Sequence, residues 1–210
     1  MDKNILKLFT EADIVKKVQI KLPKLFQIAE LESQRAGKVG MEVGSIRERI
    51  IVSLLIYKFG EGNVETEIPI TEPEVDVKLF GKPISIKTKS GSGYTGVKLI
   101  WTVDARNALE FQNKYIPSCD MIYVQINWEN SGGLFYFPQQ VQQDIFNSIG
   151  REDYIKLPSQ GTNPRGVEIS SKALQKLVEH NDIHKIVIDW KKEEIKFNAF
   201  KRWIDLWAQE

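Results

Sequence analysis

The sequence predicts a fold of the α/β or α+β class built on a central mixed β-sheet. Three observations support this prediction. The first sixty residues read as helices, and from Val64 onward several short segments alternate between apolar and polar side chains. Helix-like and strand-like segments are then mixed to the end of the chain. This order of helices, strands and mixed elements favours a sheet with helices packed against it.

Composition indicates one folded domain. The chain has 210 residues, of which 42% are hydrophobic, enough for one substantial core. We expect a single domain over 1–210, with a helical part at about 1–60, a sheet core at about 61–140 and a remainder that completes the fold. The net charge of +1 gives no strong overall attraction to nucleic acid. A local basic groove can still bind it, because binding follows the distribution of charge.

The location expected from the sequence is the cytoplasm. Cys119 is the single cysteine, so the chain forms no internal disulfide. The opening segment MDKNILKLF lacks the long apolar core of a signal peptide. No apolar run approaches membrane-spanning length, and we expect no membrane partner.

The N-terminal part is expected to hold three helices. The first forty residues read as two helices broken near Pro23. A third helix is predicted from Ser45 to Phe59, since Ser45 and Glu48 fit a capping box and Gly60 fits a C-terminal stop. The apolar run from Ile50 to Tyr57 also fits a buried strand, but the length without a breaker favours a helix.

The remaining elements follow from periodicity. ENSGG joins two apolar runs and indicates a hairpin. The expected strands are VETEIPI, EVDVKLF, ISIKTKS, VKLIWTV, DMIYVQINW, GGLFYFP and IHKIVIDW. The expected later helices are PQQVQQDIFNSIG, SSKALQKLVEH and an amphipathic C-terminal helix, AFKRWIDLWAQE. On that last helix Trp203 and Trp207 are interpreted as core or dimer contacts rather than platforms for base stacking.

The segment EVDVKLFGKPISIKTKS predicts a charged hairpin. With FGKP as the turn, Leu79 faces Ile84, Val77 faces Ile86 and Asp76 faces Lys87. This register puts the apolar side chains of both strands on one face and the charged ones on the other. The charged face has an ordinary explanation as a solvated surface, where opposite charges across strands contribute roughly 0.2–1 kcal/mol per pair.

These residues resemble the PD-(D/E)xK nuclease superfamily. Pro73-Glu74-Val75-Asp76 followed by Ser85-Ile86-Lys87 looks like its motif, with Glu48 on the preceding helix. The resemblance implies an α/β nuclease core, with a central mixed β-sheet flanked by helices and a helical N-terminal part. The sequence departs from the motif at Ser85, where the family usually has an acid. Glu48 is expected to supply the missing acid, although it also fits the capping box alone.

The resemblance implies Mg²⁺-dependent cleavage of phosphodiester bonds. Mg²⁺ takes oxygen ligands, here the carboxylates of Asp76 and Glu48 and, as the family implies, the backbone carbonyl of Ile86. Lys87 is expected to orient the attacking water and to stabilise charge on the phosphate. Ser85 completes the set of candidate catalytic residues.

A second resemblance covers most of the chain. The stretches KLPKLFQIAELESQRAGKVGMEVG, ETEIPITEPEVDVKLFGKPISIK, IPSCDM and GTNPRGVE are similar to the ThaI type of type II restriction endonuclease. That resemblance implies a homodimer that cuts double-stranded DNA bluntly at the palindrome CGCG. It also implies that Met41, on a glycine-flanked loop, intercalates into CpG steps from the minor groove. An unbranched apolar wedge suits this role, while packing of Met41 against the following helix is the structural alternative.

Further DNA contacts are predicted in three segments. Arg165 suits bidentate contact with guanine, with Asn163 and Gln160 as weaker candidates, and Arg165 equally fits an ion pair with an acid. Around the Met41 loop the expected phosphate contacts are Arg35, Lys38, Arg47 and Arg49. After the catalytic strand they are Lys89, Ser90 and Ser92.

Two other functions stay open at this level. One is a repair nuclease or junction resolvase of the same superfamily. The other is a DNA-binding module that has lost cleavage, which the absence of an acid at Ser85 keeps open.

Overall fold

A six-stranded mixed β-sheet forms the centre of the molecule. The computed structural model describes residues 3–35, 38–40, 42–69, 71–72, 74–158 and 166–209. The sheet has the order β11-β8-β7-β5-β4-β3, and only β5 and β7 run parallel to each other. Its strands are β3 (Val64–Glu65), β4 (Val77–Leu79), β5 (Lys82–Ser90), β7 (Asp120–Ile126), β8 (Ser131–Phe137) and β11 (His184–Asp189). The predicted α/β class with a central mixed sheet is confirmed.

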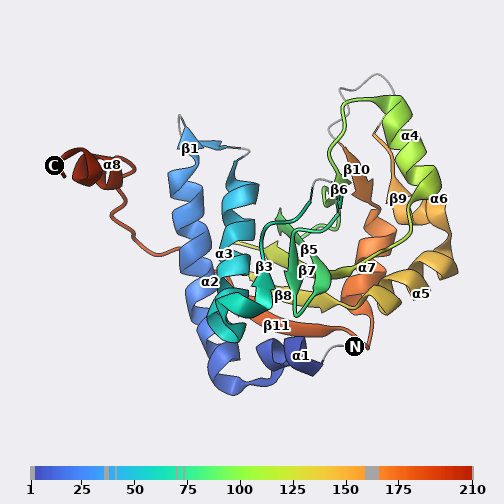
Figure 1. Ribbon diagram of the computed structural model, residues 1–210, viewed down its shortest axis with the longest axis horizontal. Coiled ribbons are helices and arrows are strands. Elements are labelled where there is room, and N and C mark those ends of the chain that lie inside the picture. The colour runs from blue at the N-terminus through green and yellow to red at the C-terminus, as the bar shows by residue number, and fades with distance from the viewer. Residues whose placement is uncertain are drawn as a thin grey trace.

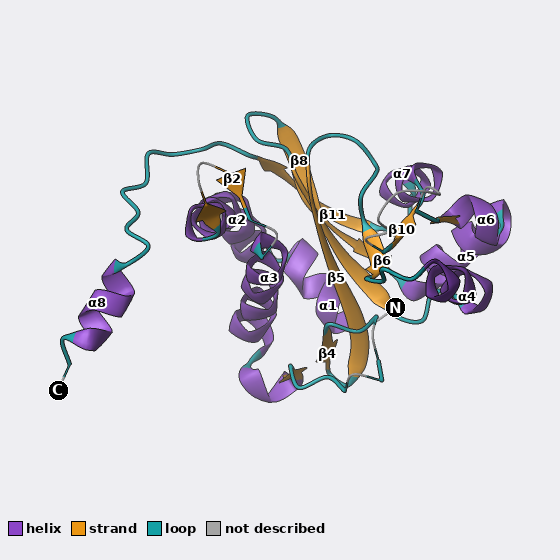
Figure 2. Ribbon diagram, turned by 90° about the horizontal axis from the view of Figure 1, so that it is seen from above, coloured by secondary structure: helices purple, strands orange, loops and turns teal. Residues whose placement is uncertain are grey.

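Helices cover both faces of this sheet (Figures 1 and 2). One face carries α1 (Lys3–Thr10), α2 (Ala12–Glu32) and α3 (Val43–Phe59). The other carries α4 (Ala105–Lys114), α5 (Gln139–Ile149), α6 (Arg151–Tyr154) and α7 (Ser171–Glu179), together with a small antiparallel sheet of β6 (Lys98–Ile100), β10 (Val167–Ile169) and β9 (Ile155–Lys156). The short elements η1 (Glu61–Asn63), β1 (Gln34–Arg35) and β2 (Lys38–Val39) complete the body.

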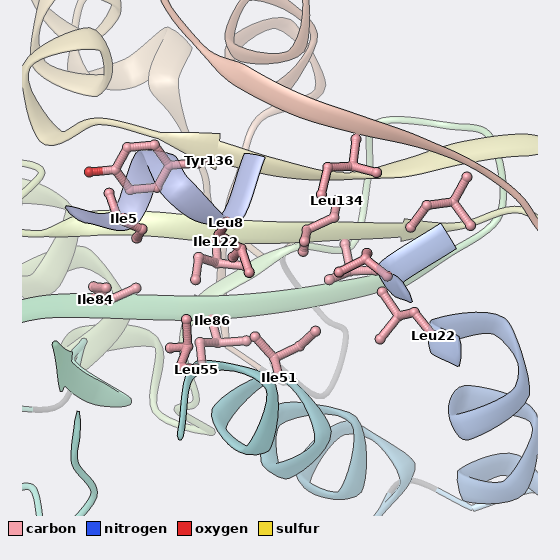
Figure 3. Packing of buried hydrophobic residues seen from close by; sticks show 14 of the residues in the cluster. Ile5, Leu8, Leu22, Ile51, Leu55, Ile84, Ile86, Ile122, Leu134 and Tyr136 are labelled. Carbon is pink, nitrogen blue, oxygen red and sulfur yellow. The ribbon is translucent and has the colours of Figure 1, made fainter. Parts of the chain in front are cut away.

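The alternation of side chains along the strands divides the core into two clusters. Ile86 of β5 and Ile122 of β7 pack with Ile51 and Leu55 of α3 on the helical N-terminal face (Figure 3). Their neighbours, such as Tyr123, point to the opposite face and pack against α5, α7 and the small sheet. Because both faces are covered, the strands at the centre carry apolar residues on both sides.

The N-terminal helices differ from the prediction in two details. The break between α1 and α2 falls at Glu11, and Pro23 lies inside α2, so the expected break near Pro23 is wrong. The third helix begins at Val43, two residues before the expected start, and no side chain caps its N-terminus. The capping box of Ser45 with Glu48 is therefore wrong. The stop at Gly60 is confirmed, with φ of +87°.

The charged hairpin has a tighter turn than predicted. Leu79 pairs with Lys82, so the turn is Phe80-Gly81, and Val77 pairs with Ile84 rather than Ile86. Both turn residues have positive φ, 50° and 75°, as a two-residue turn of type I′ requires. The predicted register is wrong by two residues. A shift of two preserves the faces, which explains how the alternation could agree with both registers.

Asp76 lies at a bulge at the end of this hairpin. Its backbone N–H donates to the carbonyl of Ile84 at 3.0 Å, and Ile84 is also the pairing partner of Val77. Asp76, directly before β4, and Val77, its first residue, therefore both oppose Ile84, which is the arrangement of a β-bulge. Such bulges redirect a side chain, and here the redirected side chain is the carboxylate of Asp76.

Some strands and helices were predicted incompletely. VETEIPI is a strand only at Val64–Glu65, and VKLIWTV only at Lys98–Ile100, which belongs to the small sheet. The sequence prediction missed α4, although Asp104 caps it by accepting from the N–H groups of Arg106 and Asn107 at 2.7 and 3.1 Å. Among the described residues, no helix combines the length and apolar character that crossing a bilayer requires.

The C-terminal segment leaves the body as an arm. After Trp190, which is fully buried, the chain runs outward past α2 and ends in α8 (Lys201–Trp207) (Figures 1 and 2). No residue of α8 is buried. Trp203 and Trp207 are 56% and 90% exposed, so the interpretation of these residues as core is wrong. Their interpretation as dimer contacts stays a prediction.

Candidate active site

An open cleft of about 630 Å³ lies where the N-terminal half of α3 meets the β4–β5 edge of the sheet. Glu48, Asp76 and Lys87 line it together, although they come from three separate elements. The other lining residues are Gly44, Ser45, Thr88, Gly96, Val97, Lys98, Leu99, Ile100 and Trp101. The fold thus brings together the three charged residues that the motif selected.

One oxygen of Asp76 accepts three hydrogen bonds. Its Oδ2 lies 2.6 Å from the backbone nitrogen of Ile86, 3.2 Å from the Ser85 hydroxyl and 3.3 Å from Nζ of Lys87. Donors of this kind hold the carboxylate in a fixed orientation. The other oxygen, Oδ1, takes no part in these three contacts.

The carbonyl of Ile86 is directed to the same edge. Within a strand, the N–H and C=O of one residue point to the same side, and the N–H of Ile86 points to Asp76. The pairing of β4 with β5 ends at Val77 and Ile84. The Ile86 carbonyl is therefore directed beyond the end of β4, beside the Asp76 carboxylate, as the family resemblance implied.

Glu48 is the second carboxylate at the cleft. It lies one residue after Arg47, whose side chain is buried, and is itself half-buried. Burial, and after it the negative charge of Asp76, raise the pKa of Glu48 to about 7, while Lys87 opposes the shift. A carboxylate that loses solvation beside another carboxylate is characteristic of sites that hold a cation. Because its capping role is absent, the Glu48 side chain is available for the cleft.

Ser85 lies at the position where the motif usually has an acid. It is fully buried, and its hydroxyl donates to Asp76. The Ser85 hydroxyl thus helps to hold the Asp76 carboxylate in position. Glu48 approaches the same carboxylate from α3, so an acid is present in the site through a different element.

Lys87 lines the cleft beside the Asp76 carboxylate. Its side chain is 14% exposed, against 27% for Asp76. An ammonium group in this position neutralises part of the negative charge and can donate to a phosphate oxygen or a water molecule. The Asp76–Lys87 proximity is confirmed as a contact, although the two residues are not directly opposite in the hairpin.

The donor set fits Mg²⁺. Two carboxylates and one backbone carbonyl are the oxygen ligands that this ion prefers, with water and substrate phosphate completing its shell. In the part of the chain that the structure describes, no group of three or more Asp, Glu, His or Cys side chains forms a denser metal cluster.

Several predicted DNA contacts lie outside the described residues. These are Met41, Arg165, Asn163 and Gln160. Of Arg35 the structure describes the backbone, in β1, and Lys38 is exposed on β2 of the same two-stranded hairpin. Arg49 is exposed on α3. A strand, β10, follows the segment of Arg165.

Lys89, Ser90 and Ser92 continue β5 toward the loop that follows it. Nζ of Lys89 lies 3.4 Å from the carbonyl of Ser90, and burial lowers the pKa of Lys89. Ser90 and Ser92 are exposed. The Ser90 hydroxyl accepts from Nη1 of Arg47 at 3.2 Å. Lys89 and Ser90 thus lie at the solvent end of the strand that carries Lys87, and Ser92 lies in the loop that follows it.

Arg47 is turned into the protein. Its side chain is 6% exposed, and Nη2 lies 2.6 Å from Oε1 of Glu30 on α2. In this chain the guanidinium is engaged between α2 and the end of β5, rather than turned to solvent. These contacts hold Arg47, the residue beside Glu48, in place.

Sequence reasoning missed two residues that line the cleft. Lys98 of β6 pairs with Glu168 at 3.2 Å and lies over the ring of Trp101, 5.0 Å from its centroid. Trp101 is 68% exposed. A cation beside an exposed aromatic ring in the segment VKLIW was the available signal. It was read only as a strand pattern.

Fold and site together define a nuclease. A central mixed sheet presents Lys87 on β5 and Asp76 directly before β4, with Glu48 on a packed helix, and comparison with known proteins agrees. The family model described as restriction endonuclease ThaI matches residues 8–209. The chain belongs to this family of restriction endonucleases, hydrolases that act on DNA.

A solved structure supports the same assignment. It is described as a restriction endonuclease in complex with substrate DNA, is 61% identical to this chain, and has a TM-score of 0.93. The match covers 98% of this chain and 99% of the other. No curated protein matches the chain. Family membership favours restriction over a repair nuclease, a junction resolvase or a non-cleaving DNA-binding module.

Proposed function

We propose that the chain, acting as one domain over residues 1–210 in the cytoplasm, cuts double-stranded DNA at a specific palindrome with Mg²⁺. The observation that carries the proposal is the group formed by Asp76, the Ile86 backbone, Lys87 and Glu48 at one cleft. This is the arrangement that hydrolysis of a phosphodiester bond requires: oxygen ligands for a cation beside a fixed positive charge.

The roles of the residues follow from their positions. Asp76, Glu48 and the carbonyl of Ile86 would hold Mg²⁺, which supplies an activated water and offsets charge on the phosphate when bound. Ser85 and the Ile86 N–H orient Asp76. Lys87 donates to the attacked phosphate group and stabilises the charge that develops there.

The proposed target is CGCG, cut bluntly between its central bases by a homodimer. Family membership supports this target, and a two-fold dimer matches a palindrome because each copy contacts one half-site. Met41 is proposed to intercalate at CpG steps, and Arg165, with Asn163 and Gln160, to contact base edges. Phosphate contacts are assigned to Arg35, Lys38, Lys89, Ser90 and Ser92.

A cleavage assay tests the proposal. Plasmid DNA incubated with the protein and Mg²⁺ at low salt should give discrete fragments, and run-off sequencing should place the ends between the central bases of CGCG. Asp76→Ala and Lys87→Ala should abolish the fragments while binding to DNA persists. Asp144→Ala, on α5 and not among the residues of the cleft, is the matched control and should cut normally. Normal cutting by Lys87→Ala would refute its role.

Replacing Met41 tests the intercalation step. Met41→Ala should weaken cleavage of CGCG sites about tenfold or more, because the energy of the unstacked step, a few kcal/mol, is no longer offset by the wedge. Fluorescence of 2-aminopurine placed beside the CpG step reports the unstacking directly. An unchanged signal with Met41→Ala would exclude this residue as the wedge.

A further inference from the structure

The C-terminal helix carries an apolar stripe that no other described element buries. Phe200, Trp203, Ile204 and Trp207 recur at the spacing of one helical face, and they are 71%, 56%, 59% and 90% exposed. Leu206 lies off this stripe. A single exposed apolar side chain is ordinary, but four on one face are typical of an interaction surface.

This helix needs a partner to be stable. It has seven residues, none of them buried, and isolated helices of fewer than about 12 residues are marginal in water. The ion pair of Lys201 with Asp205 on this helix is exposed and contributes little. Contacts with another surface must therefore supply the stability.

The arm is fixed at its root and directed away from the body. The side-chain amide of Gln27 on α2 donates to the carbonyl of Glu193 at 2.7 Å and accepts from its N–H at 3.0 Å. Lys192 pairs with Glu30 at 3.5 Å. From this root the chain runs outward, and α8 lies apart from α2 and α3 (Figures 1 and 2). The segment from Glu193 to Lys201 spans at most about 28 Å, enough to reach an adjacent molecule.

The same chain presents an apolar groove between α2 and α3. Its volume is about 310 Å³, and its lining is almost wholly apolar. Val18, Leu22 and Leu25 of α2 and Ile50, Leu54 and Tyr57 of α3 form the groove, with Lys17, Lys21 and Ser53 beside them. Leu25 and Tyr57 are 41% and 61% exposed. Indole and phenyl rings at helical spacing fit a groove of this kind.

We propose that two copies of the chain exchange their C-terminal arms, with the stripe of α8 from each copy seated in the α2–α3 groove of the other. The arrangement is reciprocal, so a two-fold axis closes it at two copies. It gives α8 the partner that it lacks and covers the groove, using two surfaces of one chain. The inference rests on the homodimer of the proposed function and identifies the contact that holds it together.

Sedimentation velocity over a concentration series tests the stripe. The wild-type chain should be a dimer, and the double variant Trp203→Ala and Trp207→Ala should raise its dissociation constant about 100-fold or more. Leu206→Ala, on the same helix but off the stripe, is the control and should change it less than about threefold. Because no residue of α8 is buried in the body, these variants keep the core intact, and circular dichroism checks this. A dimer unchanged by the double variant would overturn the proposal.

Two substitutions on α2, one inside the groove and one outside it, test the groove as the docking site. Leu25→Glu places a charge in the groove, and Ile20→Glu places one on the same helix outside the groove, where Ile20 is 59% exposed. Leu25→Glu should dissociate the dimer and Ile20→Glu should leave it intact. Equal effects of the two variants would contradict the groove as the docking site.

Cross-linking distinguishes exchange from folding back within one chain. A copy with Leu25→Cys is mixed with a copy of different length that carries Ile204→Cys. Cys119 can stay, since it is 3% exposed and burial raises the pKa of its thiol to about 12. A disulfide between the two different copies is expected. If the bridge forms only when both cysteines are in one chain, the arm docks on its own groove and the proposal fails.

The proposed function is measured separately in the same preparations. A wild-type dimer that cuts DNA, with a dimer insensitive to the stripe variants, would refute arm exchange and leave the nuclease intact. A protein that dimerises through its arms but does not cut with Mg²⁺ would refute the proposed function alone.

Discussion

Arg47 of α3 and Glu30 of α2 form a buried ion pair, with 2.6 Å between Nη2 and Oε1 and side-chain exposures of 6% and 10%. The same Glu30 oxygen accepts from the indole N–H of Trp128 at 2.8 Å, and Nη1 of Arg47 donates to Ser90 at 3.2 Å. Burial lowers the pKa of the Arg47 guanidinium, and Glu30 opposes that shift. The pair thus joins α2 and α3 to the end of the catalytic strand.

Removing the acid of this pair should be costly. Glu30→Gln leaves a buried guanidinium without its counter-charge, and we expect a loss of about 3 kcal/mol in the free energy of unfolding, measured by urea denaturation. Glu32→Gln, on the same helix but exposed, is the control and should change stability by less than about 0.5 kcal/mol. Similar values for both variants would show that the Glu30–Arg47 pair is not a structural contact.

The Glu48 carboxyl should make stability depend on pH. Its pKa is about 7 in the folded chain, above its ordinary value of 4.5. Protonation therefore stabilises the folded state below pH 4.5, and this stabilisation is lost as pH rises through 7. Glu48→Gln stays neutral and should be more stable than wild type at pH 8, by about 1–2 kcal/mol after allowance for solvent screening. The difference should vanish near pH 5.

Thermal unfolding at pH 5 and pH 8, without added metal, measures this difference. Glu61→Gln, at an exposed glutamate, is the control; it retains Glu48 and should match wild type at both pH values. Added Mg²⁺ should raise the unfolding temperature of wild type at pH 8, since binding to the folded state stabilises it, and should do so less for Glu48→Gln. An equal effect of Mg²⁺ on both proteins would argue against Glu48 as a ligand.

Ser85 should support Asp76 without being a metal ligand. Ser85→Ala removes one donor to Asp76 and leaves the N–H of Ile86 and Lys87 in place. We expect a loss of about 0.5–1.5 kcal/mol in stability and cleavage within about fivefold of wild type under saturating Mg²⁺. Loss of cleavage on the scale of Asp76→Ala would instead assign the missing ligand to Ser85.

The stability of the chain should depend on Gly81 in the hairpin turn. Gly81 has φ of +75° and open space where a Cβ would lie, so Gly81→Ala should cost about 1–2 kcal/mol from the backbone alone. Gly62 also has open space but no positive φ, and Gly62→Ala should be neutral or slightly stabilising. Chemical denaturation compares the two. An undiminished stability of Gly81→Ala would speak against the Phe80-Gly81 turn.

Much of the sheet could be predicted from side-chain alternation, but alternation fixes a register only to within two residues. Val77 faces the same core whether it pairs with Ile84 or Ile86. The turn decides between them, and Phe80 gave no signal for a positive φ. In the structure its backbone N–H donates to Asn63 and its ring packs edge-on against Phe59. These contacts come from a distant part of the sequence and hold an aromatic residue in a glycine-like conformation.

The site was predicted to the extent that its motif is local. Asp76 and Lys87 lie on one hairpin, so their contact follows from its sequence. Glu48 required knowledge of where α3 begins, and a plausible capping box at Ser45 suggested a different role. The Glu30–Arg47 pair joins two helices, and nothing in the spacing of the sequence reports on it. The sequence instead favoured a solvent-exposed Arg47 in contact with phosphate, because arginines in polar segments commonly take that role.

The cleft forms because β4 is much shorter than its neighbour in the sheet, β5. β5 extends from Lys82 to Ser90, but β4 accompanies it only from Val77 to Leu79. Beyond Ile84, on the side of β5 that faces β4, the backbone N–H of Ile86 donates to the side chain of Asp76 instead of to a paired strand. Backbone hydrogen-bonding groups of β5 that would have paired with a longer β4 are thereby left for other partners. Extending β4 by two paired residues would therefore close the opening, with every charged side chain of the motif still present.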